Sequence, residues 1–396
     1  MLRQLTINDK NQLKLEMAGC QVDPAGINIM LGKGEFIILK TSPLPPAGCN
    51  ILKQQMLSVG GEAAVSKGAA NCSIDSKPAI IFGTRKQFKQ LVAGLDYQCF
   101  GLERLQQELK EFLSKNSATI FEVGEQRFDL SKKTLIMGIL NVTPDSFSDG
   151  GHYSGGEKAY SHAMEMIEQS ADIIDIGGES TRPGAAEVDL KTELSRVIPV
   201  IEKIRQKSDI PISIDTYKSE VAEKALAAGA DIVNDISGLN FDEKMAGVIA
   251  KNKASAVLMH IQGTPQNMQK KPVYENMIDE ILTYLCKSAG KLRNLGVDKT
   301  KIVLDPGIGF GKPWRRNYDI IRYLKELKSA GYPLLVGPSR KSFIGNLLDL
   351  PVDERLEGTL AAITASILHG ADIVRVHDVK ETFRAVRVAD EIIGKK

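Results

Sequence analysis

Cysteine pairs are absent from this sequence. The five cysteines, Cys20, Cys49, Cys72, Cys99 and Cys286, are odd in number, and no two are separated by two residues. A disulfide framework and a cysteine-ligated zinc site both need paired spacings, so the sequence argues against both. We therefore expect a reducing compartment, and we expect the first four cysteines to fill small apolar gaps.

The chain also lacks an excess of charge and a long apolar run. Its 51 Lys and Arg nearly balance its 49 Asp and Glu, so the net charge is +2. That balance gives no electrostatic reason to bind nucleic acid or an anionic membrane. The longest uncharged helical stretch, residues 358–371, is too short to span a bilayer, and charges stand where a signal peptide needs an apolar run. We expect a cytoplasmic protein without nucleic-acid or membrane partners.

Histidine is missing from the first 150 residues. All five histidines, His152, His162, His260, His369 and His377, lie after that point. This asymmetry divides the chain near residue 130, and 396 residues leave room for one large barrel and an additional module. We expect a small α/β module of unknown function over residues 1–125 and a second domain over residues 133–396.

Short apolar runs alternate with helical patterns from about residue 133 onward. Eight runs have the length of strands: Leu135–Asn141, Ile173–Gly177, Ile212–Asp215, Ile232–Asp235, Ala256–His260, Ile302–Asp305, Leu334–Gly337 and Ile373–His377. Strands that alternate with amphipathic helices indicate parallel βαβ units, and eight units in roughly 265 residues suit a barrel better than an open sheet. The predicted fold class is α/β, a (β/α)8 TIM barrel preceded by a small α/β domain.

Residues 1–125 have a different pattern. A strand-like start is followed by a strand at 37–40, a helix near 50–59, a strand at 79–82 and helices at 85–93 and 102–115. The region contains no histidine, no tryptophan and no cluster of residues that carry chemistry. We interpret it as a structural, dimer-forming or regulatory module. A second enzyme activity is the alternative, which no motif supports.

Polar residues end nearly every predicted barrel strand. They are Asn141, Asp175, Asp215, Asn234, His260, Asp305, Ser339-Arg340-Lys341, Arg375 and His377. In a parallel barrel these ends share one mouth, and a buried carboxylate is costly unless it is paired or hydrogen-bonded. The set therefore predicts a ligand rich in donors and acceptors. Arg375 and His377 fall on the same face of one strand and indicate an anion site.

Taken one at a time, several of these residues have structural alternatives. Asp215-Thr216 and Asn234-Asp235 can cap the helices that follow them. Asp175 precedes two glycines and can order that loop, and His260 can be a histidine whose hydrogen bonds are satisfied at the rim.

Two loops carry weaker signals. Residues 305–312, Asp-Pro-Gly-Ile-Gly-Phe-Gly-Lys, depart from a phosphate-binding loop because Pro306 occupies the first glycine position and Pro313 follows the lysine. We expect their glycines to let the backbone run close under a flat ligand. Residues 178–184 are too long and polar for a minimal turn and predict a flap that brings Arg182 over the mouth.

Together these motifs resemble the dihydropteroate synthase family. The matching segments are Asn141–Gly151, Asp175–Gly184, Asp215-Thr216, Asn234-Asp235, Met259-His260, Asp305–Lys312, Ser339–Ser342 and Arg375–Asp378. Each is weak alone, but their order on eight strand ends is specific, and the resemblance covers about residues 133–394. It implies a transferase that condenses 6-hydroxymethyl-7,8-dihydropterin diphosphate with 4-aminobenzoate in folate biosynthesis.

The resemblance also implies a role for individual residues. The pterin would be bound by Asp215, Asn234, Met259, Asp305 and Lys341. The diphosphate would be bound by Asn141, Arg375 and His377, with Mg²⁺ near Asn141, since magnesium prefers oxygen ligands and substrate phosphates. The aminobenzoate would be contacted by Phe147, Thr181, Arg182, Pro183, Phe310 and Ser339. The catalytic set would be Asp149, Lys341, Arg375 and His377, with Asp149 stabilising a cationic carbon in a dissociative displacement.

Two alternatives belong to other functional classes. A pterin-binding methyltransferase domain would share the barrel and the pterin contacts, but it has no use for diphosphate ligands, and no corrinoid-binding segment is visible. A barrel turned into a binding or regulatory protein is disfavoured by the intact set of polar strand ends. Within the resemblance, we expect a homodimer formed through barrel helices and competition between sulfonamides and aminobenzoate.

Overall fold

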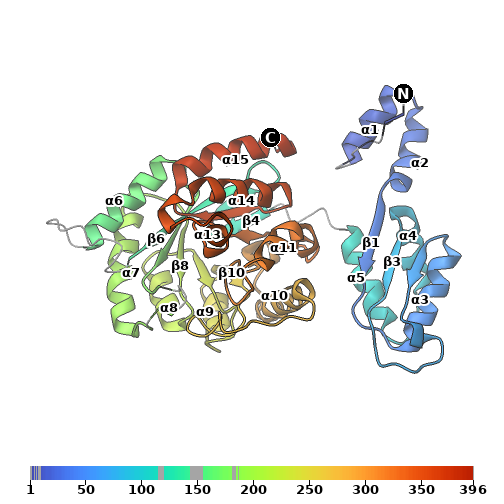
Figure 1. Cartoon of the computed structure of the whole chain (residues 1–396), viewed down its shortest axis with the longest axis horizontal. Helices are drawn as coiled ribbons and strands as arrows, with labels where there is room; N and C mark the ends of the chain where they lie inside the picture. The colour runs from blue at the N-terminus through green and yellow to red at the C-terminus, as the bar shows by residue number, and fades with distance from the viewer. Residues whose placement is uncertain are drawn as a thin grey trace. The chain divides into compact units, whose positions relative to one another are not determined.

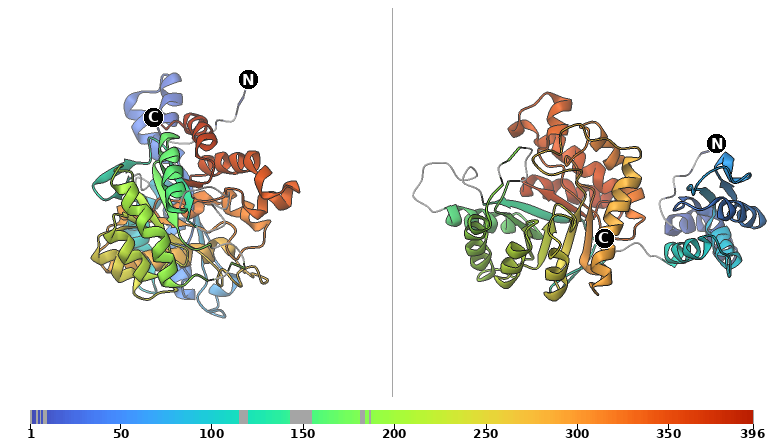
Figure 2. Two further views of the ribbon diagram at one scale, coloured as in Figure 1. Left: turned by 90° about the vertical axis from the view of Figure 1, so that its left-hand side faces the viewer. Right: turned by 90° about the horizontal axis from the view of Figure 1, so that it is seen from below.

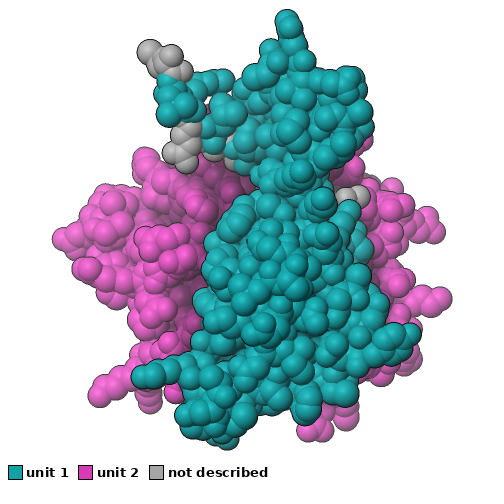
Figure 3. Space-filling view, turned by 90° about the vertical axis from the view of Figure 1, so that its right-hand side faces the viewer, with its two compact units in different colours: residues 1–115 teal, residues 116–396 magenta. Residues whose placement is uncertain are grey.

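The computed structural model describes residues 2, 3, 5, 7, 10–114, 120–142, 155–180, 184, 185 and 187–395. They form two compact units, Met1–Lys115 and Asn116–Lys396, which Figure 3 colours separately. Each unit has a hydrophobic core of its own.

The first unit is a three-stranded antiparallel sheet with helices packed on one face (Figure 1). The order across the sheet is β1 (Phe36–Lys40), β3 (Ile80–Thr84) and β2 (Glu62–Ala64). The helices that share its core are α3 (Pro46–Ser58), α4 (Arg85–Gly94) and α5 (Leu102–Ser114). Residues of β1 alternate between the two faces of the sheet. Ile37 is buried in that core, and Phe36 and Ile38 are exposed on the other face.

The expected strand-like start is wrong, because helices α1 (Lys10–Gly19) and α2 (Pro24–Gly34) precede β1. Asp23 explains where α2 begins. Its carboxylate accepts hydrogen bonds from the backbone N–H groups of Ala25 and Gly26, at 2.8 and 3.3 Å. Pro24 stands at the first helical position, where a missing N–H group leaves no bond unmade.

The second unit is a closed barrel of eight parallel strands within the described residues (Figures 1 and 2). Their order is β11 (Ile302–Asp305), β10 (Ser255–Met259), β9 (Ile232–Asp235), β8 (Ile212–Asp215), β7 (Ile173–Gly177), β6 (Leu135–Asn141), β13 (Ile373–Val376) and β12 (Leu335–Val336). A parallel bridge between Leu304 and Leu334 closes the ring. All the expected barrel strands are confirmed, and so is the TIM-barrel fold class.

Helices surround the barrel strands (Figure 2). They are α6 (Gly155–Glu168), α7 (Leu190–Arg205), α8 (Ser219–Ala227), α9 (Met245–Lys251), α10 (Met277–Asn294), α11 (Arg316–Arg322), α12 (Leu324–Lys328), α13 (Ser342–Leu348), α14 (Leu356–Leu368) and α15 (Val379–Ile393), with short 3-10 turns at Lys299–Lys301 and Val352–Glu354. Among the helices that the structure describes, none has both the length and the apolar character needed to cross a membrane.

The barrel interior is polar at its mouth, where the strands have their carboxyl ends. It is apolar at the opposite, lower end, where the strands begin. The lower layer consists of Leu135, Met137, Ile173, Ile232, Val257, Val303, Leu335 and Ile373. Because side chains alternate along a strand, residues two positions further along face the same interior. On β7, β9 and β11 these residues are Asp175, Asn234 and Asp305, all at the carboxyl end.

A β-hairpin, β4 (Ile120–Val123) and β5 (Gln126–Asp129), covers the lower end of the barrel. Phe121 and Val123 are buried in the same cluster as the lower interior layer. The hydroxyl of Ser255 donates to the carbonyl oxygen of Glu122 at 2.6 Å. Because the hairpin packs with the barrel, the first unit ends at Lys115, ten residues before the expected boundary at 125.

The cysteines are only partly where we expected them. None of the five forms a disulfide, but Cys49 alone is buried, and Cys20, Cys72 and Cys99 are exposed. The expectation that these three fill apolar gaps is therefore wrong.

Candidate active site

Arg375 is the centre of the polar layer at the barrel mouth. Its Nε donates to Oδ2 of Asp175 and its Nη2 to Oδ2 of Asp215, both at 2.6 Å. The Arg375 side chain is 20% exposed, and those of Asp175 and Asp215 are 0% and 9% exposed. The arginine therefore compensates two buried carboxylates from neighbouring strands, which would otherwise be costly to bury.

Asp175 is a site residue that the sequence-based assignment left out. Asn234 donates from Nδ2 to the same Oδ2 atom, at 3.2 Å, so Asp175 connects Arg375 to the next polar strand end. The signal was present in the sequence. Asp175 stands two residues after Ile173, so it faces the barrel interior, as the set of polar strand ends predicts, and the alternative that it orders the following loop is not needed.

Two buried carboxylate oxygens face this layer without a partner. Among the described residues, Oδ1 of Asp175 and Oδ1 of Asp215 have no hydrogen-bond partner. Burial raises the pKa of Asp215 to about 7, although the neighbouring Arg375 charge opposes the rise. A buried oxygen without a hydrogen-bond donor costs free energy, and a ligand with N–H groups would supply the missing donors.

Asp305 and Lys341 form the opposite side of the mouth. Oδ1 of Asp305 accepts from the backbone N–H of Gly307 at 2.7 Å, and burial raises the pKa of this carboxyl. The Lys341 ammonium donates to the carbonyl oxygen of Ile308 and lies 4.7 Å from the centre of the Phe310 ring. Burial lowers the pKa of Lys341 to about 8, with Asp305 opposing the shift. Acidic and basic groups with strongly shifted pKa values are typical of active sites.

The glycine-rich loop after β11 is explained by packing within the protein. A Cβ atom on Gly307 would lie 2.0 Å from the carbonyl oxygen of His260, and Gly307 has a φ of +69°. Gly309 likewise has a positive φ and packs against the Lys341 side chain. The expected reason for these glycines, close approach of a flat ligand, is not needed to account for either position.

Lys312, at the end of that loop, points into the protein. It is 2% exposed, and its Nζ lies 3.0 Å from Nδ1 of His260 and donates to the carbonyl oxygens of His260 and Phe310 at 3.2 and 2.8 Å. Burial lowers the pKa of His260 to about 2, so its imidazole is neutral. His260 is thus a buried histidine whose ring and carbonyl oxygen both bond to Lys312, in agreement with the structural alternative of a satisfied histidine.

The strand ends after β12 and β13 meet through Ser339 and His377. Oγ of Ser339 lies 3.0 Å from Nδ1 of His377 and accepts from its backbone N–H at 3.2 Å. Ser339 is 4% exposed. The residue assigned to aminobenzoate is therefore also a hydrogen-bond partner of the residue assigned to diphosphate.

The capping alternative is wrong for both pairs of strand-end residues, because the N-cap residues of α8 and α9 are Lys218 and Lys244, and neither of these side chains caps its helix. Asp235 accepts from Ser237 and Leu239 and orders its own turn. Oγ1 of Thr216 accepts from the backbone of Lys218 at the start of α8. Their neighbours Asn234 and Asp215 belong to the polar layer.

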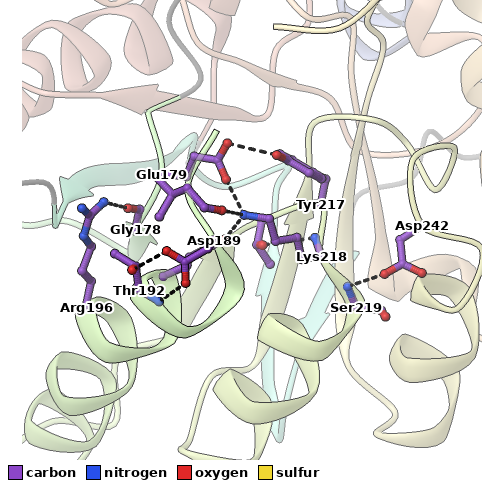
Figure 4. Close-up of polar contacts among 12 residues, drawn as sticks. Gly178, Glu179, Asp189, Thr192, Arg196, Tyr217, Lys218, Ser219 and Asp242 are labelled. Carbon is purple, nitrogen blue, oxygen red and sulfur yellow. Dashed lines mark hydrogen bonds and ion pairs between the residues drawn. The ribbon is translucent and has the colours of Figure 1, made fainter. Parts of the chain in front are cut away.

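A second polar cluster joins the ends of the β7–α7 connection to β8 (Figure 4). Nζ of Lys218 lies 2.6 Å from Oε2 of Glu179 and 2.7 Å from Oε2 of Glu193, and it donates to the carbonyl oxygen of Val188. The Tyr217 hydroxyl donates to Glu179 at 3.0 Å. One lysine therefore holds both ends of this connection.

The remaining sequence-based assignments divide into two groups. Asn141 is half-buried at the end of β6, and Met259 is 3% exposed at the end of β10. The others, Phe147, Asp149, Thr181, Arg182 and Pro183, lie outside the described residues.

Comparison with known proteins relates this chain to one family. Residues 137–377 match the family described as pterin binding enzyme. The dihydropteroate synthase of Synechocystis is 52% identical over 271 residues, which are 68% of this chain and 94% of that protein. A probable bifunctional folylpolyglutamate synthase/dihydropteroate synthase of Halobacterium salinarum is 41% identical over 371 residues, which are 93% of this chain and 44% of that protein.

Solved structures agree with these relatives. The Clostridium difficile dihydropteroate synthase, crystallised in the presence of pteroic acid, is 52% identical with a TM-score of 0.64 and covers 67% of this chain and 98% of its own. The Yersinia pestis enzyme, in complex with a sulfonamide drug, is 42% identical with a TM-score of 0.66 and covers 69% of this chain and 99% of its own.

Proposed function

The chain belongs to the dihydropteroate synthase family of pterin-binding enzymes, and we propose that the polar mouth of its barrel is the site of the family's reaction. That reaction joins 6-hydroxymethyl-7,8-dihydropterin diphosphate to 4-aminobenzoate and releases 7,8-dihydropteroate and diphosphate. The protein is thus a transferase of folate biosynthesis. The observation that carries the proposed site is the pair of buried oxygens on Asp175 and Asp215 that have no partner in the described part of the chain.

The pterin is the part of the substrate that these oxygens suit. Its amino-pyrimidinone edge presents N–H groups, and buried acceptors gain free energy when a ligand supplies the missing donors. Asp215, Asn234 and Asp305 would hold that edge, and the Asp175 carboxylate lies within the same hydrogen-bonded layer. Lys341 would donate to the pterin carbonyl and ring nitrogen, and Met259 on β10 would pack against the ring.

The diphosphate would be held by Arg375, His377 and Asn141. Arg375 uses Nε and Nη2 for the two carboxylates, and a guanidinium has five N–H donors, so others are left for phosphate oxygens. His377 stands two residues along the chain, with its ring oriented by Ser339. These groups would bind the charge that develops as diphosphate departs.

Magnesium fits this donor set. The described residues hold no cluster of three acidic, histidine or cysteine side chains that would enclose a metal ion. Asn141 instead offers one amide oxygen, so Mg²⁺ would take its other ligands from diphosphate and water, as this ion commonly does. When bound, it would supply positive charge that stabilises the leaving diphosphate.

The chemistry is a displacement at the methylene carbon of the pterin. The carbon–oxygen bond to diphosphate breaks, and the aminobenzoate nitrogen forms the new bond and then loses a proton. The electron-rich pterin spreads positive charge, so we infer a dissociative reaction that needs little general-base help. Asp149 would stabilise the cationic carbon. Phe310 and Ser339 would contact aminobenzoate, together with Phe147, Thr181, Arg182 and Pro183.

A single assay tests the proposed function. Purified protein with Mg²⁺ and the pterin diphosphate should release diphosphate only when 4-aminobenzoate is added. A sulfonamide should compete with 4-aminobenzoate and not with the pterin. The Yersinia pestis relative forms a complex with a sulfonamide drug. No aminobenzoate-dependent release would contradict the proposal and favour the pterin-binding methyltransferase alternative.

We further propose a cytoplasmic homodimer formed through barrel helices. The exposed apolar residues on or beside α13 and α15 supply a surface for it: Leu347, Leu348, Val352, Val388, Ile392 and Ile393. Five cysteines that form no disulfide suit a reducing compartment. Light scattering should give twice the monomer mass, and Leu348→Lys together with Ile392→Lys should halve it.

The first unit remains a module without assigned chemistry, for which we propose a structural or regulatory role. The Halobacterium salinarum alignment is longer than the barrel unit, so the likeness extends into the first unit. That relative carries the module beside a synthase segment in a longer protein. Deleting residues 1–115 and measuring turnover and molecular mass would separate a catalytic contribution from an effect on assembly.

A further inference from the structure

Arg340 stands between two residues of the proposed site and has an unusual backbone conformation. Its neighbours are Ser339 and Lys341, and its φ is +55°. Residues with a Cβ atom rarely adopt this left-handed conformation, and where they do so the surrounding structure must hold them.

Each polar group of Arg340 has a partner in the protein. Its backbone N–H donates to Oγ1 of the buried Thr359 at 2.9 Å, and its carbonyl oxygen accepts from Nη1 of Arg355 at 3.0 Å. Its guanidinium makes a two-point contact with Asp378, from Nε to Oδ2 at 2.9 Å and from Nη2 to Oδ1. These contacts commit Arg340 to partners outside the polar layer of the mouth.

Asp378 uses its carboxylate for Arg340 and not for its own helix. It is the N-cap residue of α15, yet its side chain makes no capping hydrogen bond. An aspartate in that position normally accepts from the first N–H groups of its helix. Here the carboxylate binds Arg340 instead, directly after His377. The ion pair thus joins the chain segment that carries Ser339 and Lys341 to the segment that carries His377.

We propose that Arg340 is a positioning residue for the transferase reaction and that Asp378 is its partner. The two-point ion pair holds the left-handed turn at Arg340, and the turn fixes the Lys341 ammonium relative to the His377 ring. One group serves the pterin and the other serves the diphosphate, so their separation sets how the scissile bond is presented. The inference rests on the proposed function for those two roles.

The test compares substitutions that keep the fold with substitutions that remove the ion pair. Arg340→Gly removes the guanidinium while glycine accepts the positive φ freely, so the turn itself remains allowed. Asp378→Asn removes the charge but keeps a good N-cap residue for α15. Arg340→Lys keeps the charge without the two-point geometry. Arg322→Lys, at an exposed ion pair on α11, is the matched control.

We expect kcat/KM for the pterin diphosphate to fall about tenfold in Arg340→Gly and in Asp378→Asn, because small displacements of reacting groups are costly. The kcat/KM of Arg340→Lys should lie between the values of these variants and that of the wild type. The variant that combines Arg340→Gly with Asp378→Asn should lose no more kcat/KM than either single variant, since both substitutions remove the same contact. Thermal midpoints should stay close to the wild type, which a purely structural role would not allow. The control should match the wild type throughout.

Binding of inorganic diphosphate, measured by calorimetry, separates this inference from the proposed function. If the wild type binds diphosphate but shows no aminobenzoate-dependent turnover, the function is wrong, and weaker diphosphate binding in Arg340→Gly still supports the positioning role. Wild-type diphosphate affinity and wild-type kcat/KM in both Arg340→Gly and Asp378→Asn would overturn it. A loss of activity that only follows a lower thermal midpoint in both variants would overturn it as well.

Discussion

Arg375 and Asp175, 200 positions apart in the sequence, form a buried ion pair with 2.6 Å between Nε and Oδ2. Asp175 also accepts from Asn234 and leaves its second oxygen without a partner among the described residues. We therefore expect Asp175→Asn to lower kcat/KM for the pterin diphosphate roughly 10- to 100-fold, as loss of a charged acceptor from a buried contact does. Steady-state kinetics with saturating 4-aminobenzoate measures this.

The Asp175 substitution has a matched control. Asp319→Asn removes a carboxylate that pairs with Arg316 and Arg322 on α11, away from the polar layer. It should leave both Michaelis constants unchanged. An Asp175→Asn variant with wild-type kcat/KM would show that the buried carboxylate serves only to neutralise Arg375.

The pH dependence of the free enzyme follows from two shifted groups. Burial raises the pKa of Asp215 to about 7 and lowers the pKa of Lys341 to about 8. The ionised Asp215 is the stronger acceptor for pterin N–H groups, so activity should rise as pH increases through about 7. Lys341 donates as a cation, so activity should fall as pH increases through about 8. The profile of kcat/KM for the pterin diphosphate should be a bell with a narrow maximum between these values.

Substitutions assign the two limbs of that bell. Lys341→Arg should move the alkaline limb to higher pH, because a guanidinium stays protonated, and Lys341→Ala should abolish turnover. Asp215→Asn should abolish the acid limb along with most activity. A flat profile between pH 6 and pH 9 in the wild type would contradict both assignments.

The barrel is predictable from the sequence because each strand couples an apolar run to a polar end. Residues such as Ile173 and Asp175 have the spacing of one face of a strand, and the same spacing recurs at Ile232 and Asn234. This pattern alone places the mouth at the carboxyl ends of the strands. It also marks Asp175 as an interior residue, although the glycines that follow offer a simpler local explanation for that aspartate.

What the sequence did not reveal depends on contacts between distant segments. Nothing local to Lys312 shows that it turns inward to His260, 52 positions away. The sequence pattern places the strand that carries Phe121 in the first module. Its packing partners are in fact barrel residues such as Leu335, far away in the sequence. The short strands of the hairpin bear no mark of where they pack.

Lys312 offers a test of how far the glycine-rich loop depends on one buried amine. Burial lowers its pKa well below the usual value, and its Nζ supports the carbonyl oxygens of His260 and Phe310. Lys312→Met keeps the volume but leaves those acceptors unpaired, which should cost about 2 kcal/mol in the free energy of unfolding. Because Phe310 loses its anchor, the KM for 4-aminobenzoate should rise more than that for the pterin diphosphate. Equal changes in both Michaelis constants would argue against this link to Phe310.

Substitution of Lys218 should cause the largest loss of stability among the variants discussed. Its ammonium contacts Glu179, as Figure 4 shows, and also Glu193. The Glu193 side chain is only 1% exposed. Lys218→Met would leave Glu193 buried without its counter-charge, which should lower the free energy of unfolding by about 3 kcal/mol. Urea denaturation of the whole chain, followed at the transition of the barrel unit, measures the change.

Two further variants separate the buried charge from the loss of a long side chain. Adding Glu193→Gln to Lys218→Met should recover part of the stability, because the neutral amide is cheaper to bury than the unpaired carboxylate. Lys251→Met, which breaks the exposed pair with Glu223, should leave the transition unchanged. If Lys218→Met and Lys251→Met have the same small effect, the two glutamates do not need Lys218, and the ends of the β7–α7 connection must be held by other contacts such as that of Arg196 with Gly178.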